Sequence, residues 1–314
     1  MLTCVLFDAT GKDRQIELKA TDLHALEPEQ LLWIDGTPAE IGAAAGLPAP
    51  MRDAMAGGAD SRGVEVSERF YQFAILHPGP RNSDGAEHIA FFVGDNWLLT
   101  LSDPRPAFMD RFLAADEGES LRGRLSASAL VAAVLLDLLS DYRADLVGID
   151  KAIDKLDETI LRAHEKRAPL KTLAVLRRRV SHVRLTLSEF ANIAHALNRP
   201  DFLTHVDASD ASYFKQLRYT FERLEDMAAR VRETIVNSFD LYDTRVSQDT
   251  NQLIKALTIV TVVTGIVGAV AAVFGMNFDI PIEHTGTRGF WLAIDGMAAS
   301  ALAVLGLAVW RRWI

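Results

Sequence analysis

Residues with small or hydroxyl-bearing side chains recur at helical spacing along one apolar stretch near the C-terminus. The stretch reads IKALTIVTVVTGIVGAVAAVFGMN from Ile254 to Asn277, and it carries no charge between Ala256 and Phe274. At 100° per residue, one narrow face of a helix over this stretch collects Ile254, Thr258, Thr261, Gly265, Gly268 and Ala272. Hydroxyl groups and bare backbone suit contact with water, so this face predicts a helix that lines an aqueous path. Small residues also let membrane helices pack closely, and the face alone leaves that alternative open.

The apolar stretch is long enough to cross a membrane, because a helix needs about 20 apolar residues to do so. We expect a first span at about 254–274, a loop at about 275–289 and a second span at about 290–310. Trp291 begins the second span and Trp310-Arg311-Arg312-Trp313 ends it, as aromatic and basic residues do at membrane interfaces. Lys255 lies on the side of these arginines, whereas the loop has only Arg288, so the basic residues predict that both termini are cytoplasmic.

The ending Gly275-Met276-Asn277, followed by a short loop and one last span, resembles the CorA family of two-span divalent-cation channels. The resemblance covers the C-terminal third of the chain well and is architectural further upstream. It implies a funnel-shaped homopentamer, in which the long helix of each subunit lines a central pore and the motif asparagines form a ring at the outer entrance. The motif matches in full at Gly275, Met276 and Asn277. The implied pore-lining positions are Asn251, Thr258, Thr261, Gly265 and Gly268.

The resemblance also implies a cytosolic funnel and an acid in the outer loop, and physical chemistry adds a hydrophobic constriction. Ile254 and Leu257, near the cytosolic end of the span, are the candidates for a constriction that closes by dewetting. The resemblance implies, in addition, cytosolic gating by Mg²⁺ at acidic residues. Asp240 is the candidate for the funnel axis and for such a cytosolic metal site, with a solvated stalk charge as the alternative. Glu283 stands where many family members carry the acid of a Met-Pro-Glu sequence, but this chain reads Ile280-Pro281-Ile282-Glu283. That departure leaves the role of the loop open.

Asparagine side chains at the entrance suit Mg²⁺, which dehydrates reluctantly and keeps an octahedral shell of water. Neutral carbonyl oxygens can accept hydrogen bonds from those waters. We therefore expect transport of hydrated Mg²⁺, with Co²⁺ and Ni²⁺ tolerated, and no bound cofactor. His284 beside Glu283 suits a softer metal. A Zn²⁺ transporter of the same family is thus the alternative, although a lone loop histidine is more often solvated.

The first span is predicted to continue an unusually long cytosolic helix. No glycine or proline occurs from Asp201 to Thr264, which predicts a helix from Val206 to Phe274 about 100 Å long. A polar path is expected to continue from the span into the cytosol, because Asp240, Ser247 and Asn251 share the face of Thr258. The soluble half also carries an apolar seam, from which we expect partner helices and self-association. The seam consists of Phe214, Leu217, Phe221, Leu224, Ala228, Val231, Ile235 and Tyr242.

The rest of the chain reads as a cytosolic α/β domain at 1–125 and a region of long helices and stalk at 126–250, ahead of the membrane domain at 251–314. Strands are expected at Thr3–Phe7, Gln15–Leu18, Leu31–Ile34, Arg69–Leu76, His88–Val93 and Trp97–Leu101. Turn formers from His77 to Gly85 predict an antiparallel hairpin there. Helices are expected at Pro38–Ala45, Pro50–Ala56, Ala107–Ala115, Ser126–His164 and Leu170–Leu197, with a break at Ala168-Pro169.

Composition and charge exclude several classes of function. The formal net charge of −9 argues against a nucleic-acid partner. Cys4 is the single cysteine, so no intramolecular disulfide is possible and a reducing compartment is expected. The N-terminus lacks the basic region of a secretory signal, and no phosphate loop or catalytic triad stands out, so we do not expect an enzyme. The prediction is a homopentameric divalent-cation channel of the inner membrane, and the alternative from another class is a membrane-anchored cytosolic scaffold.

Overall fold

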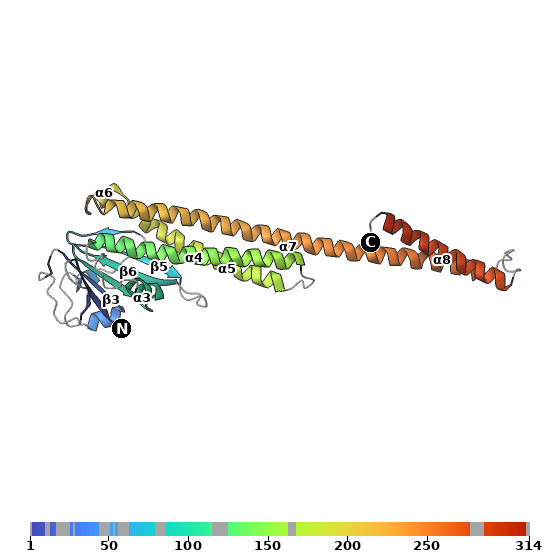
Figure 1. Cartoon of the computed structure of the whole chain (residues 1–314), viewed down its shortest axis with the longest axis horizontal. Coiled ribbons are helices and arrows are strands. Elements are labelled where there is room, and N and C mark those ends of the chain that lie inside the picture. The colour runs from blue at the N-terminus through green and yellow to red at the C-terminus, as the bar shows by residue number, and fades with distance from the viewer. Residues whose placement is uncertain are drawn as a thin grey trace. The chain divides into compact units, whose positions relative to one another are not determined.

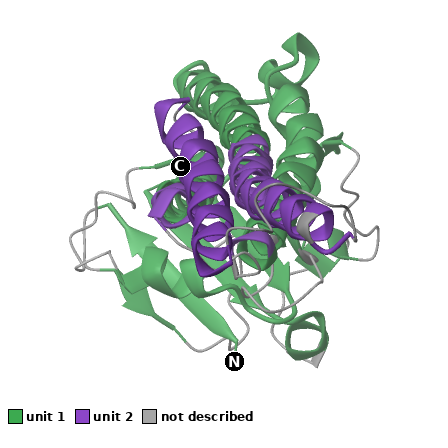
Figure 2. Ribbon diagram, turned by 90° about the vertical axis from the view of Figure 1, so that its right-hand side faces the viewer, with its two compact units in different colours: residues 1–156, 171–237 green, residues 157–170, 238–314 purple. Residues whose placement is uncertain are grey.

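The chain forms two compact units, shown in Figure 2: residues 1–156 with 171–237, and residues 157–170 with 238–314. The computed structural model describes residues 2–9, 13–16, 26–27, 29–43, 51–52, 54–55, 63–78, 86–114, 125–162, 168–276 and 286–311. The first unit contains a sheet and the long helices that cover it. The second contains the apolar part of α7 (Ala211–Phe274) and the whole of α8 (Thr287–Trp310), the two helices among the described residues that are long and apolar enough to cross a membrane.

The described part of the first unit contains one sheet of seven strands in the order β2-β1-β3-β7-β6-β5-β4. The strands are β1 (Thr3–Asp8), β2 (Arg14–Gln15), β3 (Gln30–Gly36), β4 (Glu65–Val66), β5 (Tyr71–Pro78), β6 (Ala86–Val93) and β7 (Trp97–Ser102). β5 and β6 are antiparallel, with Ile75 opposite Ile89, which confirms the predicted hairpin. The sequence did not predict β4, whose two exposed residues lie at the edge of the sheet. Residues 17 and 18 of the predicted second strand lie outside the described residues.

The helices follow the predicted order along the chain (Figure 1). They are α1 (Pro38–Ala43), α3 (Ala107–Ala114), α4 (Ala127–Arg162), α5 (Ala168–Ala196), α6 (Pro200–Leu203), α7 (Ala211–Phe274) and α8 (Thr287–Trp310). Residues 51–52 and 54–55 of the helix predicted after α1 are also helical. Pro169 does not simply end a helix as predicted. It lies in the first turn of α5, where its missing N–H has no helical partner to lose.

The larger core cluster of the first unit lies between one face of the sheet and the helices α3, α4, α5 and α7. A smaller cluster, which includes Leu32 and Ile41, packs α1 against the sheet. Phe73, Phe91, Leu138, Phe190 and Phe221 are all buried within the larger cluster. Each such side chain contributes about 1.5–3 kcal/mol through burial. The sheet and the long helices are therefore one packed body within the first unit.

The apolar seam of α7 has its partners inside its own chain, which corrects the expectation drawn from it. Phe214, Leu217 and Phe221 are at most 1 % exposed, and they pack in the same cluster as residues of α4 and α5. Val231 and Ile235, further along the seam, are at most 3 % exposed. A heptad-like seam requires partner helices but does not say which chain supplies them. The seam therefore gives no support to self-association.

α7 begins at Ala211 and not at Val206 as predicted, because a buried polar contact fixes its start. The Ser126 hydroxyl donates a hydrogen bond of 2.5 Å to the Asp210 carboxylate, and Asp210 is 6 % exposed. The backbone N–H of Ala129 in turn donates to the Ser126 hydroxyl oxygen over 3.0 Å. A carboxylate is favourable near helix N-termini. This contact therefore ties the starts of α4 and α7 together.

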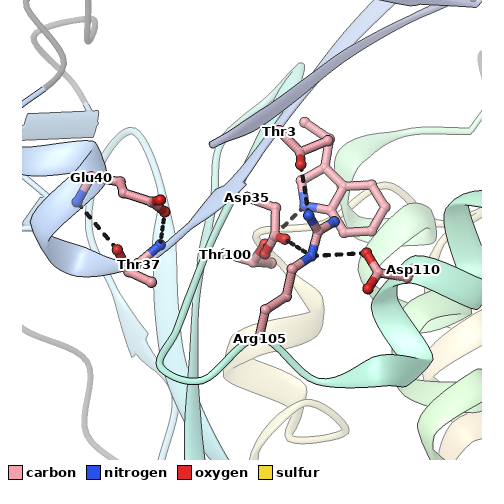
Figure 3. A network of polar contacts seen from close by, with 8 residues as sticks. Thr3, Asp35, Thr37, Glu40, Thr100, Arg105 and Asp110 are labelled. Atoms are coloured by element: carbon pink, nitrogen blue, oxygen red, sulfur yellow. Dashed lines mark hydrogen bonds and ion pairs between the residues drawn. The ribbon is translucent and has the colours of Figure 1, made fainter. Parts of the chain in front are cut away.

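A second buried polar contact joins four elements of the first unit (Figure 3). Asp35, at the end of β3, is 1 % exposed, and its carboxylate lies 2.8 Å from Nε of Arg105. It also accepts a 2.5 Å hydrogen bond from the Thr100 hydroxyl on β7. Arg105 extends to the Thr3 hydroxyl of β1 at 2.6 Å and to the Asp110 carboxylate of α3 at 3.3 Å. Burial raises the pKa of Asp35, while Thr100 and Arg105 counteract that rise.

In the second unit, α8 packs on one side of α7, where Ile259 is buried and Val263 and Ile266 are half-buried. Ile259 on α7 is 7 % exposed, and Gly289 and Ala308 of α8 are buried. α8 begins at Thr287, about one turn before the predicted start. The two helices lie beside each other in Figures 1 and 2. Both are long enough and apolar enough to be membrane spans.

Candidate functional site

The face of α7 predicted to line a pore is not covered by any described residue of its own chain. Asn251, Thr258, Thr261, Gly265 and Gly268 are all exposed. A Cβ atom added at Gly265 or Gly268 would meet nothing within 4 Å. α8 therefore packs on α7 without needing these two glycines. Among the described residues of this chain, none packs against these two glycines.

The two threonine hydroxyls on this face donate their protons to the backbone of α7 itself. The Thr258 hydroxyl donates to the carbonyl oxygen of Ile254, and the Thr261 hydroxyl to that of Leu257, each over 2.8 Å. With its proton engaged in this way, each hydroxyl oxygen presents only lone pairs to its surroundings. The exposed face can therefore accept hydrogen bonds, as the outer waters of a hydrated cation require.

Large apolar side chains adjoin these threonines at the start of the span. Ile254 is 55 % exposed and Leu257 is 66 % exposed. Neither is covered by α8, although both lie next to polar positions. Their exposure is compatible with a hydrophobic constriction formed with other copies of the chain.

Polar residues occupy the part of α7 that precedes the span. Asp240 and Ser247 are exposed, as a path through the stalk requires. The Arg245 guanidinium lies 3.6 Å from the Asp249 carboxylate one turn further on. Within the described ranges, no three His, Cys, Asp or Glu side chains are grouped so as to hold a metal ion.

The predicted entrance motif is described only in part. α7 ends at Phe274, and the next two N–H groups still bond to its last turn: Gly275 N–H to Ala271 at 2.9 Å, and Met276 N–H to Val273 at 3.2 Å. Met276 is 49 % exposed. Asn277, Glu283 and His284 lie outside the described residues.

The sequence analysis missed the polar contact between Asp35 and Arg105, which are far apart in the chain. The position of Asp35 at the end of β3 and of Arg105 just after β7 could have suggested it, because these two strands are parallel and end at the same edge of the sheet. The contact lies within the first unit and does not involve the predicted pore residues.

Comparisons with known proteins agree with this architecture. Residues 49–310 match the family model described as CorA-like Mg²⁺ transporter protein. The cobalt/magnesium transport protein CorA of Methanocaldococcus jannaschii is 22 % identical over 80 % of this chain and 79 % of its own length. The protein of the same name from Thermotoga maritima is 25 % identical over 56 % of this chain and 50 % of its own length.

A solved structure shares the fold along almost the whole chain. The complete structure of the M. jannaschii CorA magnesium transporter superposes with a TM-score of 0.76 at 20 % identity, covering 99 % of this chain and 98 % of that one. The N-terminal α/β region, the long helix and the two C-terminal apolar helices all have counterparts in that fold. The chain therefore belongs to the family of CorA-like Mg²⁺ transporter proteins, which are divalent-metal transporters of the membrane and not enzymes.

Proposed function

We propose that five copies of this chain form a channel that carries hydrated Mg²⁺ across the inner membrane. The observation that carries this proposal is the exposed face of α7, where hydroxyl oxygens and glycines occupy a span that the chain's own α8 leaves open on that side. A polar and small-residue face is poorly suited to lipid. Additional copies of α7 would enclose it around an axis.

The helix that bears this face also reaches into the cytosolic part of the chain. α7 is continuous for 64 residues, so Asp240 and Asn251 are connected to Thr258 without a break. In the proposed channel, Asp240 attracts cations on the cytosolic side and Asn251 lines the path. Ile254 and Leu257 form the constriction that excludes water when the channel is closed.

The entrance is proposed to be a ring of Asn277 side chains, with Gly275 and Met276 shaping the helix end below it. Amide oxygens accept hydrogen bonds from the waters that Mg²⁺ retains, so the ion can enter without being stripped. Glu283 in the outer loop adds negative charge near this entrance. Co²⁺ forms a hydrated ion similar to that of Mg²⁺, and two relatives are named cobalt/magnesium transport proteins. Ni²⁺ is expected to be tolerated for the same reason.

The proposed orientation places both termini in the cytoplasm and the loop between α7 and α8 outside. Lys255 and Arg311 then lie on the cytoplasmic side. A divalent ion that moves inward across 100 mV gains about 4.6 kcal/mol, because each elementary charge gains about 2.3 kcal/mol. The membrane potential therefore suffices to drive uptake.

The decisive experiment measures Mg²⁺ entry into proteoliposomes that contain the full-length protein and a Mg²⁺-sensitive dye. Asn277→Ala should lower the initial rate at least about tenfold, because the ring loses its acceptors. Asn237→Ala, on an exposed position of α7 far from the span, is the matched control and should leave the rate unchanged. Unaltered entry in Asn277→Ala would refute the entrance ring.

The same liposomes distinguish the alternatives. Faster entry of Zn²⁺ than of Mg²⁺, measured with a Zn²⁺-sensitive dye, would make the protein a zinc transporter of the family. Absence of flux for every divalent cation tested would favour the membrane-anchored scaffold. Mass measurement of the detergent-solubilised protein determines the number of subunits, and any number other than five would contradict the pentamer.

A further inference from the structure

Asp295 is an acidic residue inside the second span, where a charge is unfavourable. α8 is 24 residues long and, besides Asp295, its only charged residue is Arg288. Such a helix is about 36 Å long, so in a hydrocarbon layer of about 30 Å Asp295 lies roughly a third of the way in. Carboxylates at membrane depth need a partner or water.

Asp295 points away from its own α7. The residues that α8 buries or half-buries in its own chain form one face: Gly289, Ala293, Met297, Ser300, Ala301, Val304 and Ala308. At 100° per residue, Asp295 lies about 180° from the centre of this face. Any partner of its carboxylate therefore comes from outside the α7–α8 pair.

The outward face that carries Asp295 has the composition of a lipid-facing surface. Trp291 is 59 % exposed, Leu302 is 67 % exposed and Val309 is 60 % exposed, and all three share this side of α8. Interfaces between membrane helices are instead enriched in small residues. On this side of α8, Ala299 and Gly306 are the small residues nearest to Asp295 in angle, beside these larger side chains. The large apolar side chains favour lipid as a neighbour of this side.

An open hollow accompanies Asp295 at the beginning of α8. It measures about 420 Å³ and is lined by Thr287, Arg288, Trp291, Leu292 and Asp295. Arg288 lies two helical turns before Asp295 on the same face, about 10 Å along the axis. Because side chains of a helix lean toward its N-terminus, the Asp295 carboxylate leans toward Arg288. The hollow offers a guanidinium at its outer end, a carboxylate at its inner end and an indole between them.

We propose that this hollow binds the headgroup of phosphatidylethanolamine, with the phosphate on Arg288 and the ammonium on Asp295. The guanidinium fork matches phosphate oxygens, and the ammonium N–H groups donate to the carboxylate. The trimethylammonium group of phosphatidylcholine has no N–H to donate. Phosphatidylglycerol brings no positive charge and leaves Asp295 uncompensated. Trp291 suits the membrane interface in which such a headgroup lies.

Native mass spectrometry of the full-length protein in detergent tests this proposal, with the three lipids added separately on identical acyl chains. The unaltered protein should retain phosphatidylethanolamine about tenfold more than either other lipid. Asp295→Asn should abolish that preference and Asp295→Glu should keep it. Arg288→Gln should weaken retention of both phosphatidylethanolamine and phosphatidylcholine. Asp249→Asn on the stalk is the matched control and should change nothing.

Equal retention of the three lipids by the unaltered protein would overturn the proposal, as would an undiminished preference in Asp295→Asn. If the lipids are retained equally and Asp295→Asn also separates the subunits, Asp295 contacts a neighbouring chain and the lipid site is wrong. The measurement does not involve ion flux. Its failure is therefore distinguishable from a failure of the proposed transport function.

Discussion

The Thr258 hydroxyl donates its hydrogen bond to the carbonyl oxygen of Ile254, one turn earlier on the same helix, over 2.8 Å. This bond orients the oxygen lone pairs of Thr258 outward from α7. Thr258→Val keeps the shape but removes these acceptors, so we expect Mg²⁺ flux in proteoliposomes to fall several-fold. Thr258→Ser keeps the hydroxyl and should retain most of the flux.

Ser300 on α8 provides the control for this substitution. Its hydroxyl also donates to its own helix, at the Met297 carbonyl over 2.8 Å, but it is partly buried in the chain. Ser300→Ala should leave flux unchanged. Equal flux in Thr258→Val and the unaltered protein would remove Thr258 from the ion path.

The glycines on the open face of α7 allow a steric test of the pore. Gly268→Leu meets no atom of its own chain, because even a Cβ at this position has nothing within 4 Å. The subunit should therefore fold normally, while the leucines of several copies should obstruct a shared axis and abolish flux. Circular dichroism and flux are measured on the same sample. Gly306→Leu on α8, equally open, should conduct normally, and conduction by Gly268→Leu would exclude this face from the pore.

Leu257 should control leakage through the closed channel. Leu257→Ser replaces an apolar side chain that is 66 % exposed, so a constriction closed by dewetting would remain wet. We expect Mg²⁺ flux to rise under conditions that close the unaltered protein. Val273→Ser, at a position 54 % exposed and about 160° around the helix from Leu257, should not raise it. A reduced flux in Leu257→Ser would contradict the role of this residue as a gate.

The stability of the first unit should depend on the protonation of His77. The pKa of His77 is lowered from 6.5 to about 4, mainly by burial, with Asp141 opposing the shift and Arg111 adding to it. Its ring stacks on Phe108 at 5.3 Å. Between pH 6.5 and about 4 the unfolded chain binds the proton more readily than the folded one. The contribution of neutral His77 to the free energy of unfolding should therefore be complete above pH 6.5. The free energy of unfolding should then fall by about 2–3 kcal/mol as the pH drops toward 4.

Denaturant unfolding at several pH values, followed by circular dichroism, measures this dependence. His77→Phe keeps an aromatic ring against Phe108 and removes the titration, so its curve should be flatter across that interval. His195→Gln changes an exposed histidine of α5 and should follow the unaltered protein. Identical slopes for His77→Phe and the unaltered protein would show that another group is responsible.

Much of the fold follows from local patterns in the sequence. The hairpin of β5 and β6 follows from two apolar runs around a turn-rich segment, and α4 and α5 follow from apolar residues at helical spacing. The open face of α7 is also local, since it depends on the angle between residues of one helix. The pore roles assigned to Asn277, Thr258 and their neighbours stay predictions.

Contacts between distant residues account for what the sequence did not reveal. The hydrogen bond between Ser126 and Asp210 fixes the start of α7, yet neither residue is distinctive in its own segment. The ion pair of Asp35 and Arg105 depends on the parallel pairing of β3 with β7. The apolar pattern of the α7 seam does not indicate whether its partner helices belong to the same chain or to another one. In each case pairing across the fold, and not local propensity, decides the outcome.

Because α7 is continuous, it fixes both the distance and the rotation angle between its apolar seam and its membrane span. Removing one residue between Asn237 and Ile254 would turn the span by about 100° relative to the seam that packs against α4 and α5. The large apolar residues near Ile259 would then exchange surroundings with the face of Thr258. Removing seven residues would change the angle by only about 20° while shortening the rod by about 10 Å. The length of the stalk can therefore change by whole helical turns with little rotation of the open face of the span relative to the seam, whereas a change of one residue rotates it by about 100°.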